Sequence, residues 1–195
     1  MNKLSLARSE LILGGQRSGK SRRAERLAQG WLAQSTAHRA VLIATGQPWD
    51  DEMRERIARH QQDRSERVPG MSTVEEPLEL AQAITAHGGA QTLVVVDCLT
   101  LWLSNWLMPA ETSEKKEAAA QFPRAQAAML LEAIEGCPGP LVLVGNEIGL
   151  GVIPLGREVR AFVDALGWLN QDVAQACERV TLMAAGLPLT LKGSP

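Results

Sequence analysis

A glycine-rich segment near the start of the chain limits the possible folds more than any other feature. Residues 14–21 read GGQRSGKS, match the pattern G-x-x-x-x-G-K-[ST], and directly follow the apolar run Leu11–Leu13. The residues after them are rich in alanine and arginine, which is typical of a helix. In such a strand, loop and helix, backbone N–H groups and the positive end of the helix bind phosphate oxygens. The segment therefore predicts a P-loop that binds a nucleoside triphosphate.

The P-loop pattern also assigns roles to individual residues. Lys20 is expected to reach the terminal phosphates, and the Ser21 hydroxyl is expected to bind Mg²⁺. The other members of the loop are expected to surround the phosphates with their backbone: Gly14, Gly15, Gln16, Arg17, Ser18 and Gly19.

The composition narrows the classes of partner. A chain of 195 residues has the usual size of one domain, so we expect a single nucleotide-binding domain over residues 1–195. The formal net charge of −2 argues against a nucleic-acid binder with a broad basic surface and favours small-molecule partners. Three scattered cysteines, Cys98, Cys137 and Cys177, are typical of buried thiols in a reducing compartment. Because no apolar run has membrane-span length and residues 1–10 lack the apolar core of a signal peptide, we expect a cytoplasmic protein.

Short apolar runs recur along the chain and predict the strands of an α/β fold. They cover residues 11–13, 41–44, 92–96, 141–144 and 180–183. Each run is nearly continuous, as in strands that are buried on both faces, and helical spacing separates the runs. This alternation predicts a mostly parallel sheet with helices on both faces. The tail at residues 186–192 is expected to form a turn and a short edge strand.

Polar residues follow several of these runs at the edge where a parallel sheet binds ligands. Asp97 ends the run Leu93–Val96, where an acidic residue either holds Mg²⁺ beside a P-loop or caps the next helix. Ala44, Thr45 and Gly46 end another run, and Gly145–Glu147 end a third. The segment 146–154 is either a plain connection or a loop that closes on phosphate or substrate.

A strongly charged helix is expected over residues 49–64, and it contains His60. Met53, Ile57 and His60 fall on one face, so a packing role for the histidine is one interpretation. The helix begins shortly after Gly46, close to the ligand-binding edge. A neutral imidazole beside nucleotide phosphates acts either as a nucleophile on phosphorus or as a general acid or base. Trp102 and Trp106 are four residues apart on one face of a helix after Asp97. We expect them to lie in the core or at a subunit interface.

Several motifs together resemble those of one enzyme family. They are the P-loop, Ala44-Thr45 with Asp51-Glu52-Met53, His60, Val74-Glu75-Glu76-Pro77, residues 97–105 (DCLTLWLSN), and Asn146-Glu147-Ile148-Gly149 with Pro154. Because these motifs occur in the order of that family, the chain resembles the bifunctional adenosylcobinamide kinase / adenosylcobinamide-phosphate guanylyltransferase family of cobalamin biosynthesis. The likeness extends over essentially the whole chain.

The resemblance implies a RecA-like P-loop fold, a homotrimer and two reactions. A nucleoside triphosphate, ATP or GTP, phosphorylates adenosylcobinamide, and GMP from GTP is then transferred to that phosphate through a histidine, which matches His60. The nucleotide contacts implied by the family are Gly14 to Ser21, Ala44, Thr45, Gly46, Gln61, Gln62, Asp63, Arg64, Glu75 and Asp97. With the roles that the P-loop pattern assigns, Lys20 and His60 are the expected catalytic residues, and Ser21 and Asp97 are the expected Mg²⁺ ligands.

The chain departs from the family pattern in the segment between His60 and Glu75, which is slightly longer than expected. Either Arg64 or Arg67 is therefore the basic residue of that segment, and Met71 stands where a tryptophan is common. Phe162-Val163-Asp164 replaces an expected Phe-Arg-Asp.

Two further functions use the same P-loop and Asp97. One is a simple small-molecule kinase in which His60 is structural, and the other is a RecA-like regulatory ATPase.

Overall fold

The computed structural model describes residues 5–48, 51–108, 113–152 and 154–194. Within two helices, the side chains of residues 52–53, 56–57, 60 and 113–123 lie outside this description. The strands are β1 (Ser9–Gly14), β2 (Arg39–Ala44), β3 (Met71–Glu75), β4 (Thr92–Asp97), β5 (Leu141–Val144), β6 (Arg179–Ala184) and β7 (Leu187–Lys192). The helices are α1 (Lys20–Leu32), α2 (Asp51–Arg67), α3 (Leu80–His87), α4 (Leu99–Leu107), α5 (Ser113–Gly136) and α6 (Arg157–Ala176).

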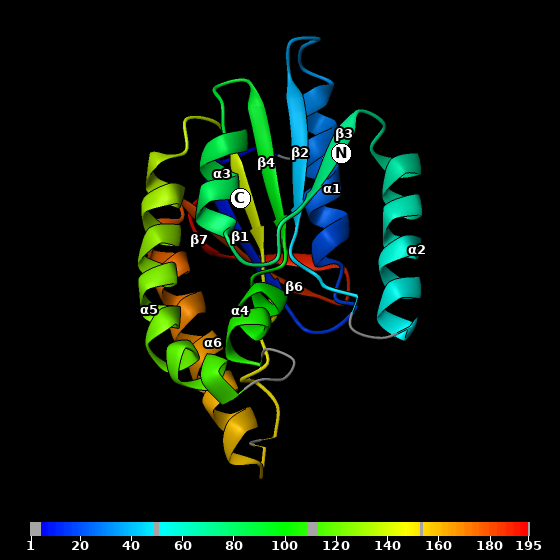
Figure 1. Cartoon of the computed structure of the whole chain (residues 1–195). Helices are drawn as coiled ribbons and strands as arrows, with labels where there is room; N and C mark the ends of the chain where they lie inside the picture. Colours follow the sequence, from blue (N-terminus) through cyan, green and yellow to red (C-terminus); the bar gives the residue numbers. More distant parts are fainter. Residues whose placement is uncertain (1–4, 49–50, 109–112, 153, 195) are drawn as a thin grey trace.

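Within the described residues, seven strands form one sheet in the order β3-β2-β4-β5-β1-β6-β7 (Figure 1). Neighbouring strands from β3 to β6 run parallel, and β7 pairs antiparallel with β6 at the edge. Every apolar run that was expected to be a strand lies in one, and the expected turn and edge strand after residue 185 are β7 and its connection. The mostly parallel sheet predicted from the sequence is confirmed.

Helices cover both faces of the sheet, and each face has its own apolar core. Figure 1 shows α1 and α2 on one side of the sheet and α3 to α6 on the other. On the α1 side, Ala24, Leu27 and Ala28 pack on strand residues such as Ile12 and Val95. On the other side, residues of α3 to α6 pack on the alternate strand residues, among them Leu11, Val94 and Leu143. Trp102 is 1% exposed in this second core, so the core interpretation of this tryptophan is correct.

The strand register brings the ends of the strands into line. Ala44 lies opposite both Glu75 and Asp97, and Asp97 lies opposite Val144. Val144 in turn pairs with Ile12, two residues before the P-loop begins. Residues that follow these positions therefore emerge along a single edge of the sheet, as expected for parallel strands.

The sequence did not predict β3. Its five residues, MSTVE, are half-buried or exposed because β3 is the edge strand next to β2. An edge strand needs no continuous apolar run, which was the signal used for the other parallel strands.

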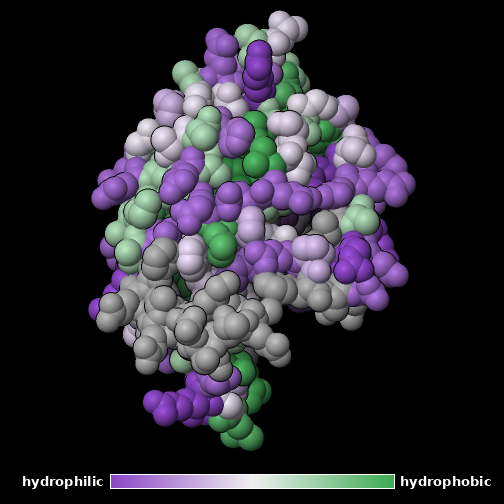
Figure 2. Space-filling model, in the orientation of Figure 1, coloured by the Kyte–Doolittle hydropathy of each residue, from purple (hydrophilic) through white to green (hydrophobic). Residues whose placement is uncertain are grey.

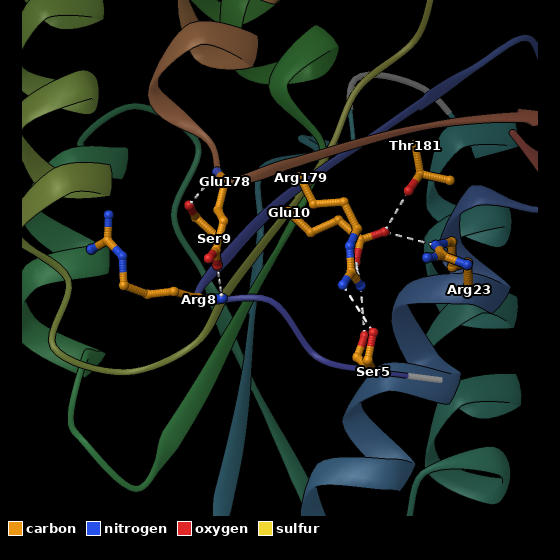
Figure 3. A network of polar contacts seen from close by, with 8 residues as sticks. All are labelled: Ser5, Arg8, Ser9, Glu10, Arg23, Glu178, Arg179 and Thr181. Carbon is orange, nitrogen blue, oxygen red and sulfur yellow. Dashed lines mark hydrogen bonds and ion pairs between the residues drawn. The ribbon is translucent and has the colours of Figure 1, made fainter. Parts of the chain in front are cut away.

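A buried ionic network joins the first strand to α1 and β6 at the base of the sheet (Figure 3). Glu10 is fully buried and accepts hydrogen bonds from Arg23 Nε at 2.8 Å and Thr181 Oγ1 at 2.8 Å. Arg179 pairs with the second carboxylate oxygen of Glu10 at 3.4 Å and donates to the backbone and hydroxyl oxygens of Ser5. The network fixes the P-loop helix against the strand that precedes the P-loop.

The three cysteines are free and buried, as the sequence predicted. Burial raises the pKa of the Cys98 thiol to about 11 and that of Cys177 to about 12. Among the described residues, the helices are too short or too polar to cross a membrane.

Replacing Glu10 with alanine is expected to lower the free energy of unfolding by about 3–5 kcal/mol, because Arg179 stays buried without its partner. Chemical denaturation measures this loss. The control is Arg54→Ala, which removes an exposed pair with Asp51 and is expected to change stability by less than about 0.5 kcal/mol. Equal losses in the two variants would contradict the structural role of the network.

Candidate active site

The P-loop is a tight turn between β1 and α1 that leaves no space for side chains at two of its glycines. A Cβ on Gly14 would lie 2.5 Å from the backbone oxygen of Met183 and 2.6 Å from Ser18 Oγ. Gly19 precedes α1 with φ of 101°, a conformation that favours glycine, and faces Gly186. The turn between β6 and β7 thus supports the P-loop directly, and the Gly186 N–H donates to Ser18 O at 3.0 Å.

The polar groups of the P-loop fit a bound phosphate. Lys20 is buried and donates from Nζ to Gly15 O at 2.7 Å, so its ammonium group lies over the loop. The buried Ser18 hydroxyl has no hydrogen-bond partner among the described residues. A P-loop binds phosphate through such N–H, ammonium and hydroxyl donors.

The side chains of Ser21 and Asp97 form a hydrogen bond at the carboxyl edge of the sheet. Ser21 Oγ donates to Asp97 Oδ2 at 2.9 Å, which joins the first turn of α1 to the end of β4. Among the described residues, no three His, Cys, Asp or Glu side chains form a metal cluster. A hydroxyl and a carboxylate are suitable oxygen ligands for Mg²⁺, which usually keeps several waters and binds substrate phosphates as well. The pair supplies two oxygen ligands. Two protein ligands fit an Mg²⁺ ion that is also bound by nucleotide phosphates, and they are too few to hold a metal without the nucleotide.

Thr45 lies at the same edge, but its polar groups are already used by the protein. The residue is fully buried, and its hydroxyl donates to Cys98 O at 2.7 Å and accepts from Cys98 N at 2.9 Å. Its N–H donates to Asp97 O, and its carbonyl accepts from Asn105 Nδ2. Thr45 fixes the ends of β2 and β4 together, while the half-buried Gly46 follows it at the edge.

The second half of α2 approaches the ends of β3 and β4. Gln61 Nε2 donates to Glu75 Oε1 at 3.0 Å, so two of the expected site residues are brought together. Gln62 contacts Glu66, and Asp63 contacts Arg67, both within α2 itself. The backbone of position 60 belongs to α2, but the side chain of His60 lies outside the described residues.

The structure distinguishes the two candidate arginines. Arg64 is half-buried and lies with Ser21, Glu25 and Asp97 around a small cleft between α1, α2 and the sheet. Burial lowers the pKa of Arg64, and Asp97 and Glu25 oppose that shift. Arg67 is exposed and pairs with Glu25 at 3.3 Å and Asp63 at 2.9 Å, and the hydrogen bond to Glu25 raises its pKa most. Arg64 is thus the arginine that faces Asp97.

The loop after β5 is anchored to the P-loop where it begins. Glu147 N donates to Gly14 O at 3.1 Å, and Asn170 donates to Asn146 O at 3.1 Å. Beyond this anchor, Leu150, Val152 and Leu155 are exposed. Figure 2 shows apolar side chains at the lower end of the molecule, where this loop and the start of α6 lie. Closure of the loop on a ligand stays a prediction.

Sequence reasoning missed two polar residues of α4 that hold the site together. Thr100 accepts a hydrogen bond from Asn146 N, and Asn105 donates to Thr45 O and Pro77 O. Their signal in the sequence was a polar side chain within an otherwise apolar helix, LTLWLSNWL. Such a residue is either exposed or hydrogen-bonded in the core, and its partner is not visible in the sequence.

The P-loop, the acidic end of β4 and the sheet define an α/β P-loop nucleotide-binding protein. The flagellar accessory protein FlaH from Methanocaldococcus jannaschii has a similar fold, with a TM-score of 0.51 and 10% identity, over 98% of this chain and 80% of that one. This likeness concerns the fold alone, and with the sheet order it confirms the expected P-loop, RecA-like class.

The sequence identifies the family within this class. Residues 10–191 match the family model described as cobinamide kinase / cobinamide phosphate guanyltransferase. The chain is 47% identical over 190 residues to the bifunctional adenosylcobalamin biosynthesis protein CobP of Pseudomonas aeruginosa, covering 95% of this chain and 98% of that protein. It is 35% identical to the bifunctional adenosylcobalamin biosynthesis protein CobU of Escherichia coli over 187 residues, covering 93% of this chain and 98% of that protein.

The chain therefore belongs to the cobinamide kinase / cobinamide phosphate guanyltransferase family. It is a bifunctional kinase and guanylyltransferase of cobalamin biosynthesis, as its motifs suggested. This membership sets aside the simple kinase and the regulatory ATPase.

Gly14→Ala is expected to cost about 1–3 kcal/mol of stability and to weaken nucleotide binding, because the added Cβ overlaps Met183 O and Ser18 Oγ. Denaturation and nucleotide titration measure the two effects. The control is Gly30→Ala in α1, where a Cβ meets nothing within 4 Å and alanine is the better helix former. Similar behaviour of the two variants would show that the turn is not tightly packed.

Arg64→Ala is expected to lower kcat/KM for nucleotide by about 10- to 100-fold, the cost of losing a hydrogen bond to a charged group. Arg67→Ala removes an exposed pair with Asp63 and a partly exposed pair with Glu25, neither of which involves Asp97, and is expected to stay within about threefold. Steady-state kinetics with each variant compare the two positions. A larger loss at Arg67 than at Arg64 would reverse the assignment.

Proposed function

We propose that the protein phosphorylates the aminopropanol hydroxyl of adenosylcobinamide and then transfers GMP from GTP to the new phosphate. The product is adenosylcobinamide-GDP. Support comes from the family and from one geometric observation, the Ser21–Asp97 contact beside the P-loop at the edge that α2 approaches with Gln61 and Arg64. Position 60 directly precedes Gln61 in α2, which is consistent with a histidine close to the nucleotide.

The first reaction is a phosphoryl transfer. The hydroxyl oxygen of adenosylcobinamide attacks the γ-phosphorus of ATP or GTP, releases its proton, and displaces the nucleoside diphosphate. Lys20, which already lies over the loop, stabilises the charge on the terminal phosphates. The preorganised N–H groups of the P-loop hold the triphosphate without further reorganisation.

The second reaction proceeds through a guanylyl-histidine. The neutral imidazole of His60 attacks the α-phosphorus of GTP, a nitrogen–phosphorus bond forms, and pyrophosphate leaves. A phosphate oxygen of adenosylcobinamide phosphate then attacks the same phosphorus, and the nitrogen–phosphorus bond breaks. GMP is thereby transferred, and His60 returns to its free form.

We assign the nucleotide contacts to the residues that the family likeness implies. They are Gly14, Gly15, Gln16, Arg17, Ser18, Gly19, Lys20, Ser21, Ala44, Thr45, Gly46, Gln61, Gln62, Asp63, Arg64, Glu75 and Asp97. Thr45 acts through the position of its backbone, because its hydroxyl is bound to Cys98. Ser21 and Asp97 are the residues that would hold Mg²⁺, which when bound neutralises charge on the phosphate oxygens.

We further propose that one domain over residues 1–195 carries out both reactions in the cytoplasm as a homo-oligomer, by family likeness a trimer. Free cysteines are consistent with a reducing compartment. The exposed apolar residues Leu150, Val152 and Leu155 are consistent with a surface that another molecule covers.

The covalent step predicts that GTP labelled at the α-phosphate leaves label on the denatured protein. Because a phosphoramidate is broken by acid and survives base, the label is expected to be acid-labile and base-stable. His60→Ala is expected to abolish the label and keep kinase turnover, whereas Lys20→Ala is expected to impair both activities, since both use the same triphosphate site.

The matched control is His87→Ala at the end of α3, which is expected to label like the wild type. Absence of label in the wild type under turnover conditions, or persistent label in His60→Ala, would refute the proposed intermediate.

A further inference from the structure

Side chains of helix α4 form hydrogen bonds with the connections that follow β2, β3 and β5. Thr100 Oγ1 accepts a hydrogen bond from Asn146 N after β5, at 2.8 Å. Trp102 Nε1 donates to Leu78 O after β3, at 2.8 Å. Asn105 Nδ2 donates to Thr45 O after β2 at 2.8 Å and to Pro77 O after β3 at 3.0 Å. One helix thus holds together the connections that follow β2, β3 and β5 at the carboxyl edge of the sheet.

Asn105 makes the link between two of these loops. Its side chain is 7% exposed, and its amide nitrogen bonds to both carbonyls. Among the described residues, neither carbonyl accepts a hydrogen bond from another donor, and a buried carbonyl such as that of Thr45 is costly to leave without one. Thr45 leads to Gly46, and Pro77 follows the turn in which Glu76 N donates to Ala44 O, next to Glu75. The ladder between β2 and β3 ends with this bond, and the Asn105 amide joins the two connections beyond it.

These two strands lie far from the P-loop in the sheet. β2 and β3 are the third and fourth strands from β1. At the usual strand spacing, their ends lie about 14 and about 19 Å from the end of β1. The P-loop holds the phosphates, so the connections after β2 and β3 are placed to contact the nucleoside part of the ligand.

We propose that Asn105 is a positioning residue for nucleoside recognition. It keeps the Thr45–Gly46 and Glu75–Pro77 segments at the separation that a bound nucleoside requires, and it does not itself touch the ligand. This inference rests on the proposed nucleotide site. It predicts that loss of the amide weakens binding of a nucleotide and leaves binding of the phosphate chain alone intact.

The test compares two ligands, GTP and inorganic triphosphate, in direct binding titrations. Asn105→Asp replaces the donor with a carboxylate that faces two carbonyl oxygens, and Asn105→Ser keeps one weaker donor and is the milder change. Both variants are expected to raise the Kd for GTP about tenfold or more, since small misplacements of a site are costly. The Kd for inorganic triphosphate is expected to stay within about twofold, because the P-loop contacts are unchanged.

The pH dependence of GTP binding by Asn105→Asp gives a second test. A carboxyl group buried between carbonyl oxygens has a raised pKa, and its protonated form donates one hydrogen bond. Relative to wild type measured at the same pH, its GTP affinity is therefore expected to improve as pH falls from 8 to 6. Asn105→Ser is expected to show no such gain.

Two controls separate positioning from other effects. Ser9→Ala removes the buried hydroxyl that accepts a hydrogen bond from Glu178 N at the start of β1 (Figure 3), away from the site, and is expected to keep both affinities. Lys20→Ala is expected to weaken both ligands together. Equal losses of GTP and triphosphate in the Asn105 variants, or no loss of GTP affinity in a folded variant, would overturn the proposal. The titrations use chains that also carry His60→Ala, in which GTP binds and no guanylyl group is transferred, so they remain decisive even if His60 is never guanylylated.

Discussion

The candidate site depends on the parallel alignment of β1, β5, β4, β2 and β3, which brings five strand ends to one edge. The register is the physical cause: Glu75, Ala44, Asp97 and Val144 lie in one row across four strands. A shift of β4 by one residue against its neighbours would turn its side chains to the other face of the sheet and separate Asp97 from Ser21. The two apolar cores on either face oppose such a shift, so packing far from the site fixes the chemistry at its edge.

The P-loop is held from both ends of the sequence. Its own strand and helix are joined by the buried Glu10–Arg23 pair. Met183 of β6 packs against Gly14, and Gly186 in the turn between β6 and β7 packs against Gly19. The last hairpin of the chain thus stabilises a loop formed by its first residues. Since a preorganised site loses little free energy to reorganisation on binding, this double support favours phosphate binding at the turn.

The sequence was informative where a local pattern determines the structure. The P-loop spacing and the buried apolar runs predicted most strands and the position of Asp97, because both signals are contained in a few consecutive residues. β3 was missed since an exposed edge strand lacks an apolar run. The role of Asn105 and the difference between Arg64 and Arg67 depend on partners distant in the chain, to which no local pattern refers. The resemblance supplied candidate residues, and only the fold showed which of them share an edge.

The two helices beside the nucleotide site are attached to the protein in different ways. α1 packs through Ala24, Leu27 and Ala28 and is joined to Glu10 by a buried ion pair. The described side-chain contacts of α2 are polar and lie at exposed or half-buried positions, as in Gln61–Glu75 and Arg67–Glu25. Exposed pairs of this kind contribute about 0–1 kcal/mol each, so the described contacts of α2 oppose its repositioning less than the buried ion pair and apolar packing oppose repositioning of α1. The proposed reactions need such a difference, because the phosphates stay in a fixed loop while attack moves from the γ-phosphorus to the α-phosphorus.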